Sequence, residues 1–252
     1  VTASRGLSKT YDGTADMNGL GLTLTGVVGV DQVSAAGQGV YSSANAATTN
    51  YAVNNMVLSG LDKDNYVLSA GNSISGTNGS ITKAALTVTA QSDLKLYDGI
   101  EYLGGNGVVY SGFVNNEGAS VLGGALAYSG DSQHAVNAGS YTITPQGLTS
   151  TNYNFTYVNA ALTVAPATIT TRPISGELQG PISKVYDGTD TASLNSSNYI
   201  LSGWVSTDTA TVSKTTGTYD SANVGNGKMV TVSLTSSDYV AGGSTNLSNY
   251  VL

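Results

Sequence analysis

The phrase Lys9-Thr10-Tyr11-Asp12-Gly13 decides how this 252-residue chain is organised, because two further copies of it follow. They are Lys95-Leu96-Tyr97-Asp98-Gly99 and Lys184-Val185-Tyr186-Asp187-Gly188, with successive tyrosines 86 and 89 residues apart. Tyrosine favours strands, and Asp-Gly favours a tight turn because glycine accepts positive φ. Each phrase is therefore predicted to be a strand end that enters a turn, with its tyrosine buried and its glycine in the turn.

A second phrase, Asn-Tyr, follows each of these copies, at Asn65-Tyr66, Asn152-Tyr153 and Asn249-Tyr250. Two phrases that recur in the same order indicate tandem modules of about 85 to 90 residues, each large enough for a modest core. The predicted modules are residues 1–90, 91–166 and 167–252. The third stops before an equivalent of Leu86-Thr87-Val88-Thr89, so we expect a piece cut from a longer array.

The remaining sequence is typical of short strands and turns. Short apolar runs alternate with Gly, Asn and Ser, and no window carries a sustained helical period. One helical turn is expected over Glu117 to Leu122 with Asn116 as its N-cap, and Gly176 to Pro181 lengthens the first segment of the third module. The junctions Thr89-Ala90-Gln91 and Val164-Ala165-Pro166-Ala167 leave almost no slack, which favours end-to-end modules with restricted hinging. The predicted fold class is mainly β, with three tandem small β modules in an elongated array.

The composition excludes several classes of partner. Only 10% of the residues are charged, the net charge is −7, and the nine Lys and Arg residues form no cluster. Nucleic acids and anionic membrane surfaces both require a positive footprint, so neither is an expected partner. The chain has no cysteine, which excludes disulfides and thiolate metal sites. No apolar stretch is long enough to span a bilayer, so direct membrane insertion is not expected.

Few residues carry a signal for chemistry. His134 is the single histidine, which argues against a His-based triad or metal site and favours a solvated loop residue. Asp62-Lys63-Asp64-Asn65 and Asp187-Gly188-Thr189-Asp190 gather oxygens of the kind calcium binds, but both lack the full calcium loop, so turn chemistry is favoured. Glu101 and Glu117 carry no sign of converging as a carboxylate pair. We predict no catalytic, cofactor-binding or metal-binding residue, no cofactor and no enzyme activity.

Two further groups of residues have a functional interpretation beside a structural one. The lysine that opens each phrase (Lys9, Lys95 or Lys184) could form an isopeptide bond with asparagine, but an ordinary exposed strand lysine is favoured. Aromatic residues of the second module form either a sugar-stacking platform or a half-buried core with cross-strand pairs, and the core is favoured. These residues are Tyr110, Phe113, Tyr128, Tyr141, Tyr153 and Tyr157.

The ordered phrases resemble the YDG-type and MBG-type repeats of large bacterial surface proteins. The first and third modules are similar to YDG repeats, because each carries Tyr-Asp-Gly-Thr, then Gly-x-Tyr-x-Ser-Ala-Asn, then Asn-Tyr-x-Leu. The second is similar to MBG repeats through Tyr110-Ser111-Gly112-Phe113, Ala138-Gly139-Ser140-Tyr141-Thr142-Ile143 and Asn152-Tyr153. One departure is Asn45-Ala46-Ala47, where the third module has Asn223-Val224-Gly225. The turn that follows in the first module is therefore less well defined by the resemblance.

The resemblance implies a function in adhesion. Such repeats occur in haemagglutinin-like exoproteins and biofilm adhesins, many of them exported by two-partner secretion. The implied function is a structural stalk segment of a secreted or surface-anchored adhesin, and the implied topology is β-grasp-like, with an immunoglobulin-like sandwich as the alternative. The alternative function is binding of an extracellular polysaccharide or a host surface glycan. Neighbouring repeat modules are the other expected partners, and the family supplies no catalytic residue.

Overall fold

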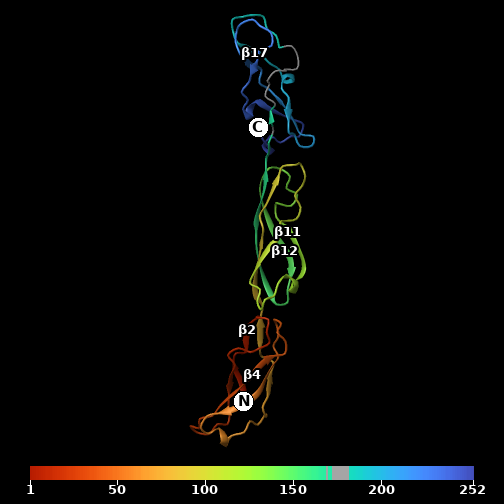
Figure 1. Cartoon of the computed structure of the whole chain (residues 1–252). Coiled ribbons are helices and arrows are strands. Elements are labelled where there is room, and N and C mark those ends of the chain that lie inside the picture. The colour runs from red at the N-terminus through yellow and green to blue at the C-terminus, as the bar shows by residue number, and fades with distance from the viewer. Residues whose placement is uncertain (169, 172–181) are drawn as a thin grey trace. The chain divides into compact units, whose positions relative to one another are not determined.

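The chain is mainly β in a computed structural model that describes residues 1–168, 170–171 and 182–252 (Figure 1). Within these described residues the helical structure is limited to short 3₁₀ turns, and the strands form many small sheets. The predicted fold class of tandem small β modules is confirmed. The lengthened segment predicted over Gly176 to Pro181 lies outside the described residues.

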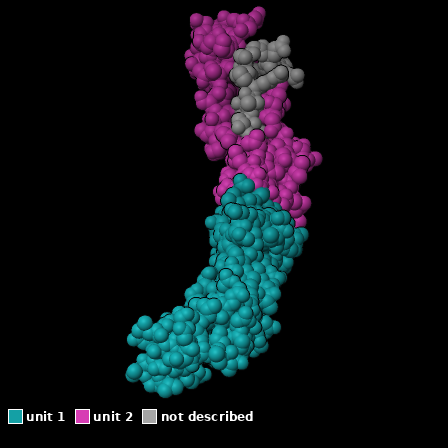
Figure 2. All heavy atoms as spheres, turned by 60° about the horizontal axis from the view of Figure 1, so that its bottom comes forward, with its two compact units in different colours: residues 1–91, 107–128, 144–159 teal, residues 92–106, 129–143, 160–252 magenta. Residues whose placement is uncertain are grey.

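The chain divides into two compact units (Figure 2). The first comprises residues 1–91, 107–128 and 144–159, and the second comprises residues 92–106, 129–143 and 160–252. The residues of the predicted second module are therefore shared between the units. Strand β12 (Gly139–Thr149) begins in the second unit and ends in the first.

The first unit contains most of the long strands. They are β1 (Thr2–Arg5), β2 (Ser8–Thr10), β3 (Gly21–Thr23), β4 (Ser34–Tyr41), β5 (Tyr51–Ser59), β6 (Ile74–Gly76), β7 (Ser80–Thr82), β8 (Ala84–Ala90), β10 (Val108–Ser111), β11 (Gly123–Ser129, apart from its last residue) and β13 (Tyr153–Val158). Its 3₁₀ turns are η1 (Lys63–Asn65) and η2 (Ala119–Val121). Strands β4 and β5 form an antiparallel hairpin that β6 extends, and β1 pairs with β3.

One extended segment connects the first two modules without a linker. Strand β7 pairs in parallel with β2, and after Lys83 the chain continues as β8. Strand β8 is the centre of a three-stranded sheet, antiparallel to β10 and parallel to β13. Residues 84–90, which the sequence groups with the first module, thus pair with strands that the sequence assigns to the second. Parallel pairs also distinguish these sheets from the antiparallel sheets of an immunoglobulin-like sandwich.

The second unit repeats this arrangement. Its strands are β9 (Asp93–Leu96), β14 (Ala160–Ala165), β15 (Ala167–Thr168), β16 (Thr170–Thr171), β17 (Thr191–Ser193), β18 (Leu201–Ser202), β19 (Thr209–Val212), β20 (Thr216–Tyr219), β21 (Val230–Thr231), β22 (Tyr239–Gly242) and β23 (Tyr250–Val251). Its 3₁₀ turns are η3 (Ser196–Asn198), η4 (Ser236–Asp238) and η5 (Leu247–Asn249). Strand β14 pairs in parallel with β9, and beyond Pro166 the chain continues as β15, which pairs in parallel with β23.

The core of the first unit continues from one module into the next. Alternation along β8 buries Ala84, Leu86, Val88 and Ala90 on one face, as a half-buried strand requires. Burial of a leucine or valine side chain stabilises the fold by about 1.5 to 3 kcal/mol. The same apolar cluster includes Tyr11, Met17, Tyr41, Ile81, Leu86 and Tyr153, which belong to both modules. The two modules therefore share one core in the first unit.

The predicted helical turn is present as η2, but its cap differs from the prediction. Gly118 is the N-cap, and Asn116 instead has a positive φ of 56° next to Asn115 at 51°. Asparagine tolerates this left-handed conformation better than most residues. These two residues form the turn that positions Glu117.

Candidate functional site

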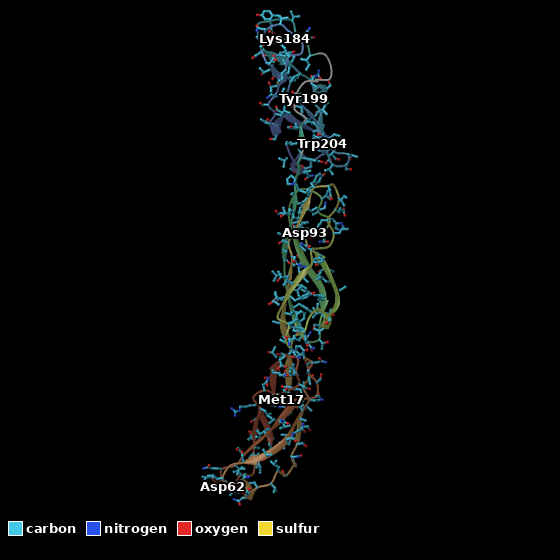
Figure 3. The ribbon with its side chains drawn as sticks, in the orientation of Figure 1. Met17, Asp62, Asp93, Lys184, Tyr199 and Trp204 are labelled. Carbon is cyan, nitrogen blue, oxygen red and sulfur yellow. The ribbon has the colours of Figure 1, made fainter. Side chains whose placement is uncertain are left out.

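Each Tyr-Asp-Gly turn is closed by its own lysine. Lys9 Nζ donates hydrogen bonds to Asp12 Oδ1 at 2.7 Å and to the carbonyl oxygen of Thr14 at 2.8 Å. Asp12 Oδ1 also accepts from the backbone N–H of Thr14 at 2.9 Å, as an Asx turn does. Lys184 makes the same bond to Asp187 at 2.8 Å (Figure 3 labels Lys184). The glycine of each turn has the predicted positive φ, between 74° and 81°.

Two of these lysines, Lys9 and Lys95, are partly buried and not exposed as the sequence predicts, whereas Lys184 is an exposed residue, as predicted. The exposed fraction of the side chain is 8% for Lys9, 18% for Lys95 and 25% for Lys184. At Lys9 and Lys95 the ammonium group bonds back to the aspartate of the turn, so the side chain lies along the chain rather than in water. In the described part of the chain, these ammonium groups donate to carboxylate, hydroxyl and carbonyl oxygens, and no asparagine amide is among their partners.

The lysine also lowers the pKa of the aspartate in the turn. The hydrogen bond from Lys184, with those from Thr189, lowers the pKa of Asp187 to about 2. The hydrogen bond from Lys95 lowers the pKa of Asp98. At Asp12, burial raises the pKa, but hydrogen bonds from Lys9 and Thr14 outweigh it and the pKa is lowered.

The tyrosine of the first turn binds a carboxylate of the next module. Tyr11 Oη donates to Glu117 Oε1 at 2.5 Å, and Tyr153 Oη donates to Glu117 Oε2 at 2.5 Å. The two tyrosine rings meet edge to face, with centroids 5.5 Å apart and an interplanar angle of 82°. The backbone N–H of Val114 donates to Tyr153 Oη at 3.1 Å. We call this set of two tyrosines and one carboxylate the junction clasp.

A second junction clasp has the same construction in the second unit. Tyr97 Oη donates to Asp208 Oδ2 at 3.0 Å, and Tyr250 Oη donates to the same oxygen. The rings of Tyr97 and Tyr250 meet edge to face at 5.4 Å and 78°. The backbone N–H of Val205 donates to Tyr250 Oη at 3.2 Å. Trp204, labelled in Figure 3, adds a further edge-to-face contact to Tyr250 at 5.0 Å, as Phe113 does to Tyr153 at 5.5 Å.

The asparagine of the Asn-Tyr phrase is held at both junctions by an Asn-Ala pair of the preceding module. Asn152 Oδ1 accepts from the backbone N–H of Ala46 at 3.0 Å, and its Nδ2 donates to Asn45 Oδ1 at 3.1 Å. The same two bonds recur in the second unit. Asn249 Oδ1 accepts from Ala138 N–H at 2.7 Å, and Asn249 Nδ2 donates to Asn137 Oδ1 at 3.0 Å. Asn249 is 1% exposed, and these bonds satisfy the polar atoms that burial takes from water.

The clasp also explains the glycine of the turn. A Cβ atom on Gly13 would lie 2.5 Å from Asn115 Cβ, and one on Gly99 would lie 3.2 Å from Val205 Cγ1. The glycine is required here for its positive φ and because the next module approaches its Cα closely. At Gly188, by contrast, a Cβ atom would meet nothing within 4 Å.

Burial and the shared carboxylate hold the clasp tyrosines in their protonated form. Burial, and then the hydrogen bond to Glu117, raise the pKa of Tyr11 to about 12. The same two causes raise the pKa of Tyr153. In the second clasp, burial and then the hydrogen bond to Asp208 raise the pKa values of Tyr97 and Tyr250. Hydrogen bonds to an ionised acceptor are about twice as strong as neutral ones, which makes each clasp a strong polar contact.

The prediction that all three turn tyrosines are buried is right for two of them. Tyr11 is 6% exposed and Tyr97 is 9% exposed, whereas Tyr186 is 63% exposed. Tyr186 was predicted wrongly because burial comes from the clasp and not from the turn: Tyr11 and Tyr97 each have a second tyrosine and a carboxylate of the next module against them. The turn of Tyr186 forms equally well without these partners.

Sequence reasoning missed the carboxylates of the clasps. Each carboxylate is the last residue of a third recurrent phrase, Gly-x-Val-x-x-Asp/Glu. This phrase reads Gly112-Phe113-Val114-Asn115-Asn116-Glu117 and Gly203-Trp204-Val205-Ser206-Thr207-Asp208. A third copy, Gly26-Val27-Val28-Gly29-Val30-Asp31, lies in the first module. In each copy the N–H of the acidic residue bonds to the valine carbonyl, at 2.9 to 3.2 Å. The spacing was available as a signal in the sequence.

The other candidate residues have ordinary structural partners. His134 is exposed and its Nδ1 lies 2.8 Å from Glu101 Oε2, so Glu101 and Glu117 each have a partner of their own. Asp62 to Asn65 form a turn closed by the backbone bond from Asn65 N–H to the Asp62 carbonyl oxygen at 3.1 Å, and Asp62 Oδ2 accepts from the distant Gln32 N–H at 2.8 Å. Across the described residues there is no cluster of three or more metal-ligating side chains, and no helix long and apolar enough to cross a membrane.

The aromatic residues of the second module are used mainly for packing. Tyr153 is 1% exposed, and Tyr110 and Phe113 pack against the core cluster of the first unit. Tyr157 stacks on Phe155 at 5.8 Å and its hydroxyl accepts from Leu148 N–H at 3.1 Å. Tyr128 and Tyr141 are half-buried. This arrangement agrees with the core interpretation.

Comparison with models of known protein families identifies the families to which the parts of this chain belong. The YDG domain family matches residues 1–74 and 165–252, and the MBG domain family of the YGX type matches residues 86–163. The chain therefore belongs to the YDG domain family, with an MBG domain between its two YDG segments, as the resemblance of the phrases implied. Domains of these two families are found in surface-associated proteins. Searches of curated proteins and of solved structures found no significant match.

Proposed function

We propose that this chain is a structural stalk segment of a secreted or surface-anchored bacterial adhesin, which extends or presents a binding region. One observation carries the proposal: the same clasp, with the same asparagine bonds, recurs at both junctions. A stalk needs each module to be fixed to the next, because bending at any junction shortens its reach. The occurrence of both domain families in surface-associated proteins supports a location outside the cell.

The junction has three features that resist bending. The connecting strand passes directly from one sheet into the next, so the junction contains no flexible tether. The tyrosine rings join the modules through an apolar contact, since Tyr11 and Tyr153 lie in one core cluster. The clasp and the asparagine bonds then fix the orientation around that contact. Together they favour a structural role over catalysis, and we propose that the chain is not an enzyme.

Glycan binding is the alternative function. The aromatic side chains of the second module are engaged in its core, which favours the stalk over this alternative. A glycan array with the whole chain tests it directly. Reproducible binding at sub-millimolar affinity would contradict a purely structural role.

The stalk proposal is tested by the distance distribution between two spin labels across the first junction. Because the chain has no cysteine, Asn18→Cys and Ser120→Cys place labels at two exposed positions of the first unit and nowhere else. We expect one narrow distance distribution for the otherwise unaltered chain, and a broad one when Tyr11→Ala is added. Adding Tyr186→Ala instead is the matched control and leaves the distribution narrow. A broad distribution without any clasp substitution would refute a junction that resists bending.

A further inference from the structure

The first module carries half of a junction clasp. Tyr66 Oη donates to Asp31 Oδ2 at 2.7 Å and accepts from the backbone N–H of Val28 at 2.9 Å. These bonds match those of Tyr153 with Glu117 and Val114, and those of Tyr250 with Asp208 and Val205. Glu117 and Asp208 each accept from two tyrosines, whereas Asp31 accepts from one tyrosine among the described residues. We call Asn65, Tyr66 and Asp31 the acceptor face.

The third module carries the other half. Tyr186 is exposed and makes no hydrogen bond or ring contact with the described residues, and Gly188 has open space where its counterparts meet the next module. Val224, the counterpart of Ala46, is 85% exposed, although Ala46 is buried against the following module. Tyr186 and Val224 both line a pocket of about 810 Å³, whose walls also include Lys184 and Tyr219. We call Tyr186, Gly188, Asn223 and Val224 the turn face.

We propose that the turn face of one chain binds the acceptor face of a second copy of the same chain. The evidence is that both halves occur in one sequence and that each kind of half is seen joined to the other at two internal junctions. In the proposed contact, Tyr186 Oη donates to Asp31 and its ring packs on the edge of Tyr66. Asn65 takes the place of Asn152 and Asn249, and bonds to Asn223 and the backbone N–H of Val224. The contact joins the third module of one chain to the first module of another.

Two properties of the association follow from this geometry. The two faces differ, so the contact is heterologous, and repeating it adds chains head to tail, into an open row or a ring, instead of forming a two-fold symmetric dimer. A second copy does not supply the strand that connects internal modules, so the association is weak, with a dissociation constant on the order of 0.1 to 1 mM, as for small transient interfaces. It does not depend on the stalk proposal, because it needs only the two complementary faces.

The test is sedimentation of the whole chain from about 0.01 to 1 mM, a range that brackets the expected dissociation constant. We expect the weight-average mass of the unaltered chain to rise with concentration. Tyr186→Ala and Asp31→Ala should each remain monomeric throughout. An equimolar mixture of these two variants should regain association, but only to the size of a dimer, because one partner retains an intact acceptor face and the other an intact turn face. Leu103→Ala, which removes an exposed apolar side chain of the second module, is the control and should associate like the unaltered chain.

Circular dichroism establishes that each variant is folded, and the mixture provides a second check because unfolded variants would not complement each other. An unaltered chain that stays monomeric to about 1 mM would overturn the proposal, since that is the weak limit expected for the contact. Association of Tyr186→Ala equal to that of the unaltered chain would also overturn it, as would failure of the mixture to form dimers.

Discussion

Tyr11 and Glu117, which are 106 residues apart in the chain, are joined by a hydrogen bond of 2.5 Å from the tyrosine hydroxyl to Oε1. The glutamate also accepts from Tyr153, so one carboxylate holds a tyrosine from each of two modules. The equivalent bond joins Tyr97 to Asp208 in the second unit. Because the second junction reproduces the first, the clasp is a property of the repeat and not of one contact.

Truncation of a clasp tyrosine should destabilise the protein strongly. Tyr11→Ala and Tyr97→Ala remove buried rings from a packed junction, and each should lower the free energy of unfolding by about 3 kcal/mol. Tyr186→Ala removes an exposed ring and should change it by less than about 0.5 kcal/mol. Denaturant unfolding of the three variants measures the difference. A loss below about 1 kcal/mol for Tyr11→Ala would mean that its burial contributes little to stability.

Two of the turn glycines, Gly13 and Gly188, offer a matched test of the close approach between modules. Gly13→Ala and Gly188→Ala both impose a positive φ on alanine, at a cost of about 1 to 2 kcal/mol. Only Gly13→Ala also places a methyl group 2.5 Å from Asn115 Cβ, so it should be the more destabilising by about 1 kcal/mol or more. Thermal or denaturant unfolding gives both values. Equal decreases in the free energy of unfolding for the two variants would show that the second module does not lie close enough to Gly13 to exclude a methyl group.

The clasp should also make stability depend on pH in the alkaline range. The pKa of Tyr11 in the folded chain is about 12, above the ordinary value of 10.0 that applies to the unfolded chain. Its contribution is therefore complete below pH 10.0 and is lost as the pH rises towards 12, because the unfolded chain releases the proton first. Tyr11→Phe removes this component of the alkaline loss. Glu117→Gln should lower the pKa of Tyr11, which a titration of phenolate absorbance measures; an unchanged pKa would contradict the role of the carboxylate.

The hydrogen bonds within the third turn should make its aspartate, Asp187, titrate at an unusually low pH. The pKa of Asp187 is about 2 because Lys184 and Thr189 donate hydrogen bonds to its carboxylate. Lys184→Met should raise this pKa towards the ordinary value of 3.8. The stabilisation from this pair is present above pH 3.8 and is lost as the pH falls through 2, because the folded chain then takes up the proton last. Carboxyl chemical shifts in an NMR titration report the value, and an unshifted Asp187 in the unaltered chain would argue against the lysine-closed turn.

The sequence predicted what depends on local chemistry. Asp-Gly is a turn dipeptide wherever it occurs, so the turns at Gly13, Gly99 and Gly188 follow from the residues themselves. The β class and the order of the modules follow in the same way, from short apolar runs and recurrent phrases.

What the sequence did not predict depends on contacts between distant residues. Tyr186 has the same local sequence as Tyr11 but lacks the partners that bury Tyr11, and no property of the Tyr-Asp-Gly phrase distinguishes them. Lys9 was expected to be exposed because a strand lysine usually is, and its bond to Asp12 appears only once the turn is formed. Glu117 showed no sign of converging with Glu101, and its partner Tyr11 was not predicted because that residue lies in another module.

Small-angle X-ray scattering of the dilute chain tests most directly the central claim, the proposed stalk, because a stalk requires the modules to follow one another in a row with fixed junctions. Three modules of about 87 residues, each about 30 Å across, give a radius of gyration near 30 Å when placed in a row. A single compact body of 252 residues would have a radius of gyration of about 18 Å. We predict a value near 30 Å with the scattering profile of a rod, and a value near 18 Å would contradict the stalk.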